Sequence, residues 1–378
     1  MKYLALALCG LSAYAATVTE VRVPDGGIQP QAAVSTDGIL HLVYYKGEAR
    51  GGDLFYVTSR DFGKTFSTPI AVNSEPGSAI SAGTIRGAQI ALGRNGMVHV
   101  AWNGSPMAKT KGTVNPESGK PGEAMFYTRL VSGHFEPQRN LMLHTFGLDG
   151  GGTLAADSDG NVYVAWHGKA PGAAEGEAGR QVWIAKSSDD GKTFAAEAPA
   201  WKQATGACGC CGMKLFANSD GKLYGLYRSA TQSVHRDVYL LTSSDHGSTF
   251  TGAMLQKWDI NACPMSSMDL ASTPGTVYGA WETAGQVYFS RLAPTASAIS
   301  PAGEAKGRKH PRIAVDSNGN VLMAWTEGTS FGKGGSLAWQ IFDARGTATS
   351  EHNREPGIPA NSFPAVAAKP DGNYLLIY

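Results

Sequence analysis

The feature that most constrains this chain is a hairpin that occurs seven times. Each copy has a short apolar strand, a tight turn that ends in glycine, and a second apolar strand, and successive turns lie 44 to 64 residues apart. The turns are Asp37-Gly38, Asn95-Gly96, Asp159-Gly160, Asp220-Gly221, Pro274-Gly275, Asn318-Gly319 and Asp371-Gly372. Self-similarity at this period is typical of repeat arrays and propellers, in which each repeat is one supersecondary unit.

Each full repeat has room for four strands. In the third repeat the second strand alternates Val162, Val164 and Trp166 on one face with side chains that are also largely apolar on the other. A strand that is apolar on both faces belongs to a sheet packed between two neighbours. The pattern predicts an all-β fold, a β-propeller of four-stranded blades. Seven hairpins indicate seven blades, and six remain the alternative if one hairpin is an insertion.

The two ends of the chain are predicted to meet in the last blade. The seventh repeat supplies only two strands before the chain ends at Tyr378, and the segment TVTEVRVP at 17–24 has strand character. Pairing between them would close the ring and leave no long open sheet edge. We therefore expect a single propeller domain over residues 16–378.

Composition narrows the class of protein. The formal net charge is +1 and there is no run of basic residues, which argues against a nucleic-acid partner. Residues 1–15 resemble a secretory signal peptide, with Lys2 before an apolar stretch and Ala13-Tyr14-Ala15 as a cleavage site. The stretch is too short to span a membrane, so no transmembrane segment is expected. We predict a monomer exported to the periplasm or the extracellular space.

One eight-residue motif occurs three times in the same position of its repeat. The pattern Ser-x-Asp-x-Gly-x-Thr-Phe stands in register at 59–66, 187–194 and 243–250. This motif resembles the Asp-box, or BNR repeat, of the sialidase-like β-propellers. The resemblance covers essentially the whole mature chain. It implies a structural role for Asp61, Asp189 and Asp245, away from the active site, and a saccharide as ligand.

Strand direction predicts which face of the propeller is functional. The turns within each hairpin and the turns that hold the three motifs share one face, and all are tight. The opposite face carries long loops of variable length, such as 105–123, 169–180 and 229–236. Function concentrates on loops that a rigid scaffold positions. We therefore expect the site on the long-loop face, where the central channel opens.

A different side chain follows the strand-ending aromatic in each of the first six repeats. These are Tyr45, Asn103, His167, Arg228, Glu282 and Thr326, with Glu327 next. The segments that enter the innermost strands add Gln31, Arg86, Asp149, Met265, His310 and Arg312. Equivalent positions in a ring converge on its axis, so the set predicts a shared site at the channel mouth.

The sialidase-like resemblance implies roles for these residues. Arg86, Arg228 and Arg312 would bind anionic groups of a saccharide, with Asn103 and His310 as further contacts. Glu282 and Glu327 would be the acid and base of glycoside hydrolysis, assisted by Tyr45 and His167. The alternative is a propeller that binds a saccharide or a protein without catalysis.

Four cysteines follow the predicted signal peptide, at 208, 210, 211 and 263. An even number in an exported chain favours two disulfides, and one pairing is a vicinal Cys210–Cys211 bridge with Cys208–Cys263. No cofactor is favoured. The alternative is a copper or redox site, in which Cys208, Cys210, Cys211, Cys263 and Met265 supply soft sulfur ligands, joined by Met213, Met268, His167 or His310.

Overall fold

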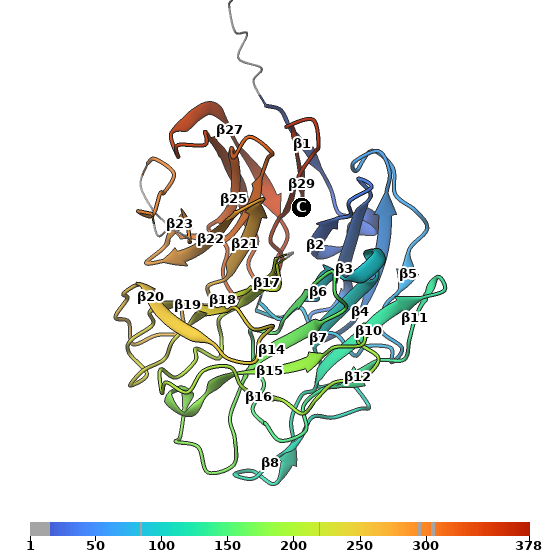
Figure 1. Cartoon of the computed structure of the whole chain (residues 1–378), viewed down its shortest axis with the longest axis vertical. Coiled ribbons are helices and arrows are strands. Elements are labelled where there is room, and N and C mark those ends of the chain that lie inside the picture. The colour runs from blue at the N-terminus through green and yellow to red at the C-terminus, as the bar shows by residue number, and fades with distance from the viewer. Residues whose placement is uncertain (1–15, 84, 219, 293–295, 304–306) are drawn as a thin grey trace, which may run out of the picture.

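The computed structural model describes residues 16–83, 85–218, 220–292, 296–303 and 307–378. Over these residues the chain forms seven small sheets arranged as a ring around a central axis (Figure 1). Each of the seven hairpins found in the sequence forms the first two strands of one sheet. The predicted seven-bladed propeller is confirmed, and six blades are excluded.

The blades are numbered I to VII in chain order by their innermost strand. Blade I contains β2 (Ile28–Val34), β3 (Leu40–Glu48), β4 (Gly51–Ser59) and β5 (Ile70–Ala71). Blade II contains β6 (Gln89–Leu92), β7 (Val98–Asn103), β10 (Met125–Val131), β11 (His134–Phe135) and β12 (Arg139–Asn140). Blade III contains β13 (Thr153–Ala156), β14 (Val162–Gly168), β15 (Gln181–Ser187) and β16 (Ala198–Pro199).

The remaining blades follow the same order. Blade IV contains β17 (Lys214–Ala217), β18 (Leu223–Arg228), β19 (Val238–Ser243) and β20 (Thr251–Gln256). Blade V contains β21 (Met268–Thr273), β22 (Thr276–Thr283) and β23 (Gln286–Arg291), and a single bridge between Phe289 and Ile299 stands at its outer edge. Blade VI contains β24 (Arg308–Val315), β25 (Val321–Glu327), β26 (Gly335–Phe342) and β27 (Ala348–Ile358).

The two ends of the chain build blade VII together. Its strands are β28 (Ala365–Ala368), β29 (Tyr374–Ile377) and the N-terminal β1 (Val18–Val21). The predicted pairing of the ends is confirmed, and β1 runs parallel to β29. The direction has a simple cause: β29 ends on the long-loop face, and β1 must reach the same face because β2 starts there. Contact between β28 and β2 completes the ring.

Little of the described chain lies outside the blades as regular structure. Three single-turn 3-10 helices, η1 (Pro24–Gly26), η2 (Arg94–Gly96) and η3 (Glu177–Gly179), and the short hairpin β8 (Val114–Asn115)–β9 (Lys120–Pro121) lie in connections. No helix in the described ranges has the length and apolar character that a bilayer crossing requires. The predicted signal peptide, residues 1–15, falls outside the described residues.

Glycine is required in the hairpin turns because of their backbone conformation. The turn glycines of all seven blades have φ between +72° and +90°. Side chains disfavour this left-handed region, and glycine enters it without a steric penalty. The tight turns return the chain at once, so that both strands of each hairpin stay in register along the channel.

The strand-ending aromatics hold neighbouring blades together. Tyr44, Trp102, Trp166, Tyr227, Trp281 and Trp325 are each at most 4% exposed. Each packs in a hydrophobic cluster that joins its own blade to the preceding one. Burying one large aromatic side chain contributes about 1.5–3 kcal/mol. The constancy of this position in the sequence is therefore explained by packing between blades.

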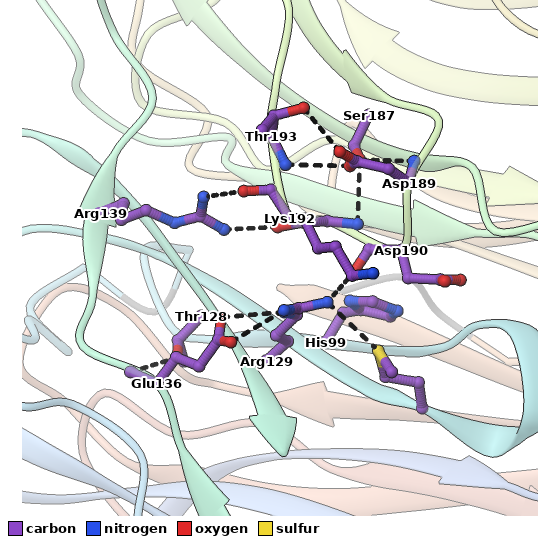
Figure 2. A network of polar contacts seen from close by, with 12 residues as sticks. His99, Thr128, Arg129, Glu136, Arg139, Ser187, Asp189, Asp190, Lys192 and Thr193 are labelled. Atoms are coloured by element: carbon purple, nitrogen blue, oxygen red, sulfur yellow. Dashed lines mark hydrogen bonds and ion pairs between the residues drawn. The ribbon is translucent and has the colours of Figure 1, made fainter.

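The three Ser-x-Asp-x-Gly-x-Thr-Phe segments form the same turn. In each, one carboxylate oxygen of the aspartate accepts hydrogen bonds from the serine hydroxyl and the threonine N–H, and the other accepts the threonine hydroxyl. Figure 2 shows the blade III copy, where Arg139 of blade II donates to the Lys192 carbonyl. The turns lie on the tight-turn face and connect neighbouring blades there.

Replacing Asp189 with alanine is expected to destabilise the protein by about 1–2 kcal/mol, because three hydrogen bonds are lost. The Thr193 N–H is the largest of the causes that lower the pKa of Asp189, to about 2. Its stabilising effect is therefore present above pH 4 and is lost as pH falls through 2. Thermal unfolding of D189A should depend less on pH in that window. The exposed Asp159 in the same blade is the control. Equal losses of stability in D159A and D189A would contradict the structural role of Asp189.

Candidate functional site

The long-loop face carries a cleft at the mouth of the channel, which we call the mouth cleft. Its volume is about 240 Å³, and its polar lining comes from Arg50, Arg86, Glu123 and Asp149. Phe331, from a loop of blade VI, completes the wall and is 59% exposed. The cleft thus combines two guanidinium groups, two carboxylates and an exposed aromatic ring on the face that the sequence predicted to be functional.

Arg86 and Asp149 are held against each other. Arg86 Nη2 forms an ion pair with the Asp149 carboxylate, and its Nε donates to the Asp149 carbonyl at 3.0 Å. A third donor of the same guanidinium binds the Ala82 carbonyl at 2.7 Å. The Arg86 and Asp149 side chains are 20% and 35% exposed, so the pair is fixed in place while it remains accessible from the cleft.

Asn103 supports the Arg86–Asp149 pair from the interior of the protein. Its Nδ2 donates to the Asp149 carbonyl at 2.8 Å, and the residue is 1% exposed. Sequence reasoning placed Asn103 among ligand contacts. In the structure it contacts the backbone that carries Asp149, so its effect on a ligand is through the position of Asp149.

The three predicted anion-binding arginines are not equivalent, and only Arg86 lines the mouth cleft. Arg228 is fully buried: its Nε donates to Ser266 Oγ at 2.8 Å, and its two terminal nitrogens bind the carbonyls of Arg236 and Glu282. These bonds link blades IV and V. The residue after the strand-ending aromatic lies inside the molecule, because the second strand of the blade extends beneath the loops that cover the long-loop face.

Arg312 belongs to a chain of polar side chains inside the channel. Lys214 Nζ lies 3.3 Å from Gln89 Oε1 and 3.7 Å from Asp269 Oδ1, and Arg312 lies 3.9 Å from the same Asp269 oxygen. Burial lowers the pKa of Lys214 and of Arg312, and Asp269 opposes both shifts. This chain joins the innermost strands of blades II, IV, V and VI.

The two predicted catalytic glutamates lie apart from the mouth cleft. Glu282 is 1% exposed, and its Oε1 accepts a hydrogen bond from the Gly285 N–H in its own turn. Burial raises the pKa of Glu282, against the opposing charge of Lys309. It is thus enclosed in blade V, and the expected pairing with Glu327 across a substrate is not present.

Glu327 occupies a different cleft, over one face of blade VI, which residues of all four strands of that blade line. It accepts hydrogen bonds from Arg354 and Trp325 and pairs with Arg308. Burial acts to raise its pKa, but these donors outweigh burial and hold the pKa of Glu327 below its usual range. Two residues beyond the strand aromatic, Glu327 lies on the same face of the sheet as Trp325, whereas sequence reasoning placed it at the channel mouth.

Tyr45 and the two histidines are also enclosed. The Tyr45 hydroxyl donates to the Glu48 carbonyl, and burial raises its pKa to about 12, which disfavours a nucleophilic phenolate. Burial, together with the nearby charge of Arg180 for His167 and of Lys309 for His310, lowers the pKa of both imidazoles to about 3. Both rings are therefore neutral, and neither lines the mouth cleft.

The cysteine loop, residues 208–212, forms a wall beside Asp149. The Gly209 carbonyl accepts a hydrogen bond from the Gly150 N–H at 2.7 Å. A side chain at Gly209 would stand 3.1 Å from Asp149 Oδ2 and 3.0 Å from the Arg180 guanidinium carbon. Glycine at this position lets the loop approach the ion pair, so the cysteines and the mouth cleft are close neighbours.

The disulfide pairing differs from the expected Cys210–Cys211 and Cys208–Cys263 bridges, neither of which is formed. Cys210 is bonded to Cys263, and Cys208 and Cys211 are free and buried. The vicinal pairing of Cys210 with Cys211 is therefore not formed. The turn directs the Cys211 side chain into the interior, where Ser266 Oγ contacts its sulfur at 3.6 Å, and presents Cys210 to blade V.

The sulfur atoms of Cys208, Cys210 and Cys211 lie within 4.8 Å of one another and could hold a soft metal ion. Two of the methionines that were considered as further ligands are elsewhere: Met213 and Met268 pack in hydrophobic clusters between blades. Because Cys210 forms a disulfide, a three-thiolate site would first require that bond to be reduced.

Sequence reasoning missed several residues of this face. Glu123 is the last residue of the long loop 105–123; sequence reasoning identified this loop but not the Glu123 carboxylate as part of a site. Phe331 is the one aromatic in the loop 328–334. Lys214 and Asp269 could have been found as charged residues at the start of innermost strands that are otherwise apolar. Their burial, and not their type, marks them as part of the channel.

Comparison with solved structures supports the scaffold. The chain is similar to a Hadza microbial sialidase (TM-score 0.52, 12% identity, 85% of this chain and 69% of that one). It is also similar to a Penicillium chrysogenum α-L-arabinanase complexed with arabinobiose (TM-score 0.56, 13% identity, 86% and 96%). A GH93 α-L-arabinofuranosidase of Fusarium graminearum matches with TM-score 0.53 and 14% identity over 84% and 93%. These likenesses show the sialidase-like propeller fold.

No family model matches the chain, and no curated protein matches it in sequence. The fold is therefore shared with propellers that act on saccharides, while the residues at the mouth must be interpreted from their own geometry.

Proposed function

We propose that the protein is a glycoside hydrolase that binds an acidic saccharide in the mouth cleft. The observation that carries the proposal is the lining of this cleft, where Glu123 and Asp149 stand with Arg50, Arg86 and the exposed Phe331. A pair of carboxylates is the usual acid and base of glycoside hydrolysis. The arginines would bind a carboxylate of the sugar, and an aromatic ring offers an apolar face for stacking.

The roles follow from the contacts. Asp149 is held by Arg86, which orients its carboxylate toward the cleft. Glu123 has no such partner among the described ion pairs, so it is free to exchange a proton with a substrate. Arg228, Arg312, Glu282, Tyr45 and the two histidines would maintain the walls. The sialidase-like scaffold and the predicted signal peptide agree with an exported saccharide-acting protein, and the mature chain is expected to begin at Ala16.

The experiment is a panel of fluorogenic glycosides that carry acidic or neutral sugars, including an α-sialoside and an α-L-arabinofuranoside. We expect release from an acidic glycoside, and Glu123→Gln should lower kcat by roughly 100-fold or more, as loss of a general acid or base does. Glu175→Gln, an exposed carboxylate on the same face, is the control. Binding without release would instead favour a carbohydrate-binding propeller. The absence of both binding and release would refute the proposal.

A copper site is the second candidate, and the convergence of the Cys208, Cys210 and Cys211 sulfurs favours it. Thiolates suit Cu(I) among the first-row metals. The fully reduced protein, titrated with Cu(I), should retain one copper per chain in native mass spectrometry. A mass equal to that of the metal-free chain would remove copper from consideration.

A further inference from the structure

The four cysteine sulfurs form a connected row on the wall of the mouth. Cys263 is bonded to Cys210, the Cys210 sulfur lies 3.5 Å from that of Cys208, and the Cys208 sulfur lies 2.9 Å from that of Cys211. The row therefore contains one disulfide and two thiols in sequence. Thiol–disulfide exchange needs a thiol sulfur in contact with a disulfide sulfur, and Cys208 meets this condition.

Exposure changes along the same row. Cys263 is exposed and Cys210 is half-buried, whereas Cys208 and Cys211 have no exposed surface. An external reagent can therefore reach the disulfide end but not the thiol end. Any reaction of the buried thiols with a molecule in solution must pass through Cys210 and Cys263 or through unfolding.

The two inner thiols are placed for proton exchange with each other. Their sulfurs are 2.9 Å apart and both are buried, so a proton can pass directly from one to the other. Ser266 Oγ, which accepts a hydrogen bond from Arg228, contacts the Cys211 sulfur at 3.6 Å and holds it in place. Cys211 is thus positioned to accept the proton that Cys208 must lose before it can attack.

Backbone hydrogen bonds fix the row in place. The Cys208 N–H donates to the Arg228 carbonyl at 2.9 Å, the Cys211 N–H to the Cys208 carbonyl at 3.2 Å, and the Gly212 N–H to the Ser266 carbonyl at 2.8 Å. The Gly209 N–H is bound by Glu177 Oε1 at 2.6 Å. The sulfur contacts are consequently a property of a rigid loop between two blades.

We propose that these cysteines form a thiol–disulfide exchange site, in which the buried Cys208–Cys211 dithiol reduces the exposed Cys210–Cys263 disulfide, which in turn reduces an external disulfide. In the first step the Cys208 sulfur attacks Cys210, its proton passes to Cys211, and Cys263 leaves as a thiolate. Cys211 then attacks Cys208 while its proton passes to the Cys210 sulfur in the same cluster, which breaks the Cys208–Cys210 bond and releases Cys210 as a thiol. The disulfide has moved inward, and no electrons have been gained or lost.

The second half of the reaction uses the external disulfide as oxidant. Cys263 attacks one of its sulfurs and forms a mixed disulfide, with release of one thiolate. Cys210 then attacks Cys263, restores the Cys210–Cys263 bond and releases the second thiolate. In sum, the external disulfide gains two electrons and the Cys208–Cys211 pair loses two. The activity is independent of saccharide binding and adds a second function to the mouth.

The test locates the reactive cysteine in the folded protein. Mature protein beginning at Ala16, which carries two thiols per chain, is treated with iodoacetamide under native conditions, then denatured, treated with N-ethylmaleimide and mapped without reduction. We expect iodoacetamide on Cys263 or Cys210 and a Cys208–Cys211 disulfide. Native resistance, with N-ethylmaleimide on Cys208 and Cys211 and an intact Cys210–Cys263 bond, would overturn the proposal, as would direct iodoacetamide labelling of the buried pair.

Two variants separate the steps. Cys208→Ser removes the attacking sulfur, so native labelling of Cys263 should disappear. Cys211→Ser removes the proton acceptor and the thiol that completes the exchange, so labelling of Cys263 should be slower than in wild type, and labelled chains should hold a Cys208–Cys210 disulfide. As a functional readout, 4,4′-dithiodipyridine should release two thiopyridones per wild-type chain and none from folded C208S, checked by circular dichroism. Equal release from wild type and C208S would mean that the row is not a relay.

Discussion

Under the proposed glycoside hydrolysis, Asp149→Ala is expected to lower the turnover of an acidic glycoside by roughly 100-fold or more, equivalent to about 2.7 kcal/mol in the transition state. Asp149 is the cleft carboxylate that a fixed guanidinium orients, and alanine removes both the reacting group and the partner of Arg86. The effect should appear in kcat and in kcat/KM, because the lost interaction is made with the reacting atoms.

The fold should tolerate this substitution. Arg86 keeps its hydrogen bonds to the carbonyls of Ala82 and Asp149, which alanine at 149 also supplies, and the Asp149 side chain is 35% exposed. The control is Asp220→Ala, which breaks an exposed ion pair with Lys222 on the tight-turn face. Unchanged kcat in D149A, with melting temperatures equal in both variants and wild type, would remove Asp149 from the reaction.

The largest effect on stability is expected at Arg228. Arg228→Met should destabilise the protein by about 3–5 kcal/mol, because the carbonyls of Arg236 and Glu282 and the Ser266 hydroxyl lose a buried charged donor. Methionine fills much of the same volume, so the loss would reflect mainly unpaired acceptors. Equilibrium unfolding in urea measures the difference directly.

Arg345→Met provides the comparison, because Arg345 pairs with Asp343 while its side chain is 86% exposed. An exposed ion pair contributes only about 0–1 kcal/mol. Stability of R228M within about 1 kcal/mol of wild type would show that these acceptors find other donors.

The fold could be predicted from local patterns because those patterns repeat. A glycine with positive φ after each first strand, and an aromatic at the end of each second strand, are short-range requirements that recur in every blade. Even the pairing of the chain ends followed from counting strands in the seventh repeat. Only its parallel direction was not anticipated, and that direction depends on which face β2 starts from.

The site was harder to predict because equivalent sequence positions are not equivalent in depth. Arg86 and Arg228 are both residues at the long-loop end of a blade, yet one lines a cleft and the other is enclosed between two blades. The difference comes from the loops that cover each blade, whose paths depend on contacts with loops distant in the chain. Phe331 of blade VI, for example, reaches the cleft beside Arg86 of blade II.

By itself, the sequence determined the propeller repeat, the seven hairpin turns, the aromatic positions between blades and the face with long loops, because each rests on the repeat or on the preference of a residue for its local backbone. Tertiary structure alone decided which charged groups are exposed, which carboxylates share a cleft and which cysteines are bonded. Those outcomes depend on distances between segments far apart in the chain, such as Cys210 and Cys263, and on burial, which sets the protonation of groups such as His167.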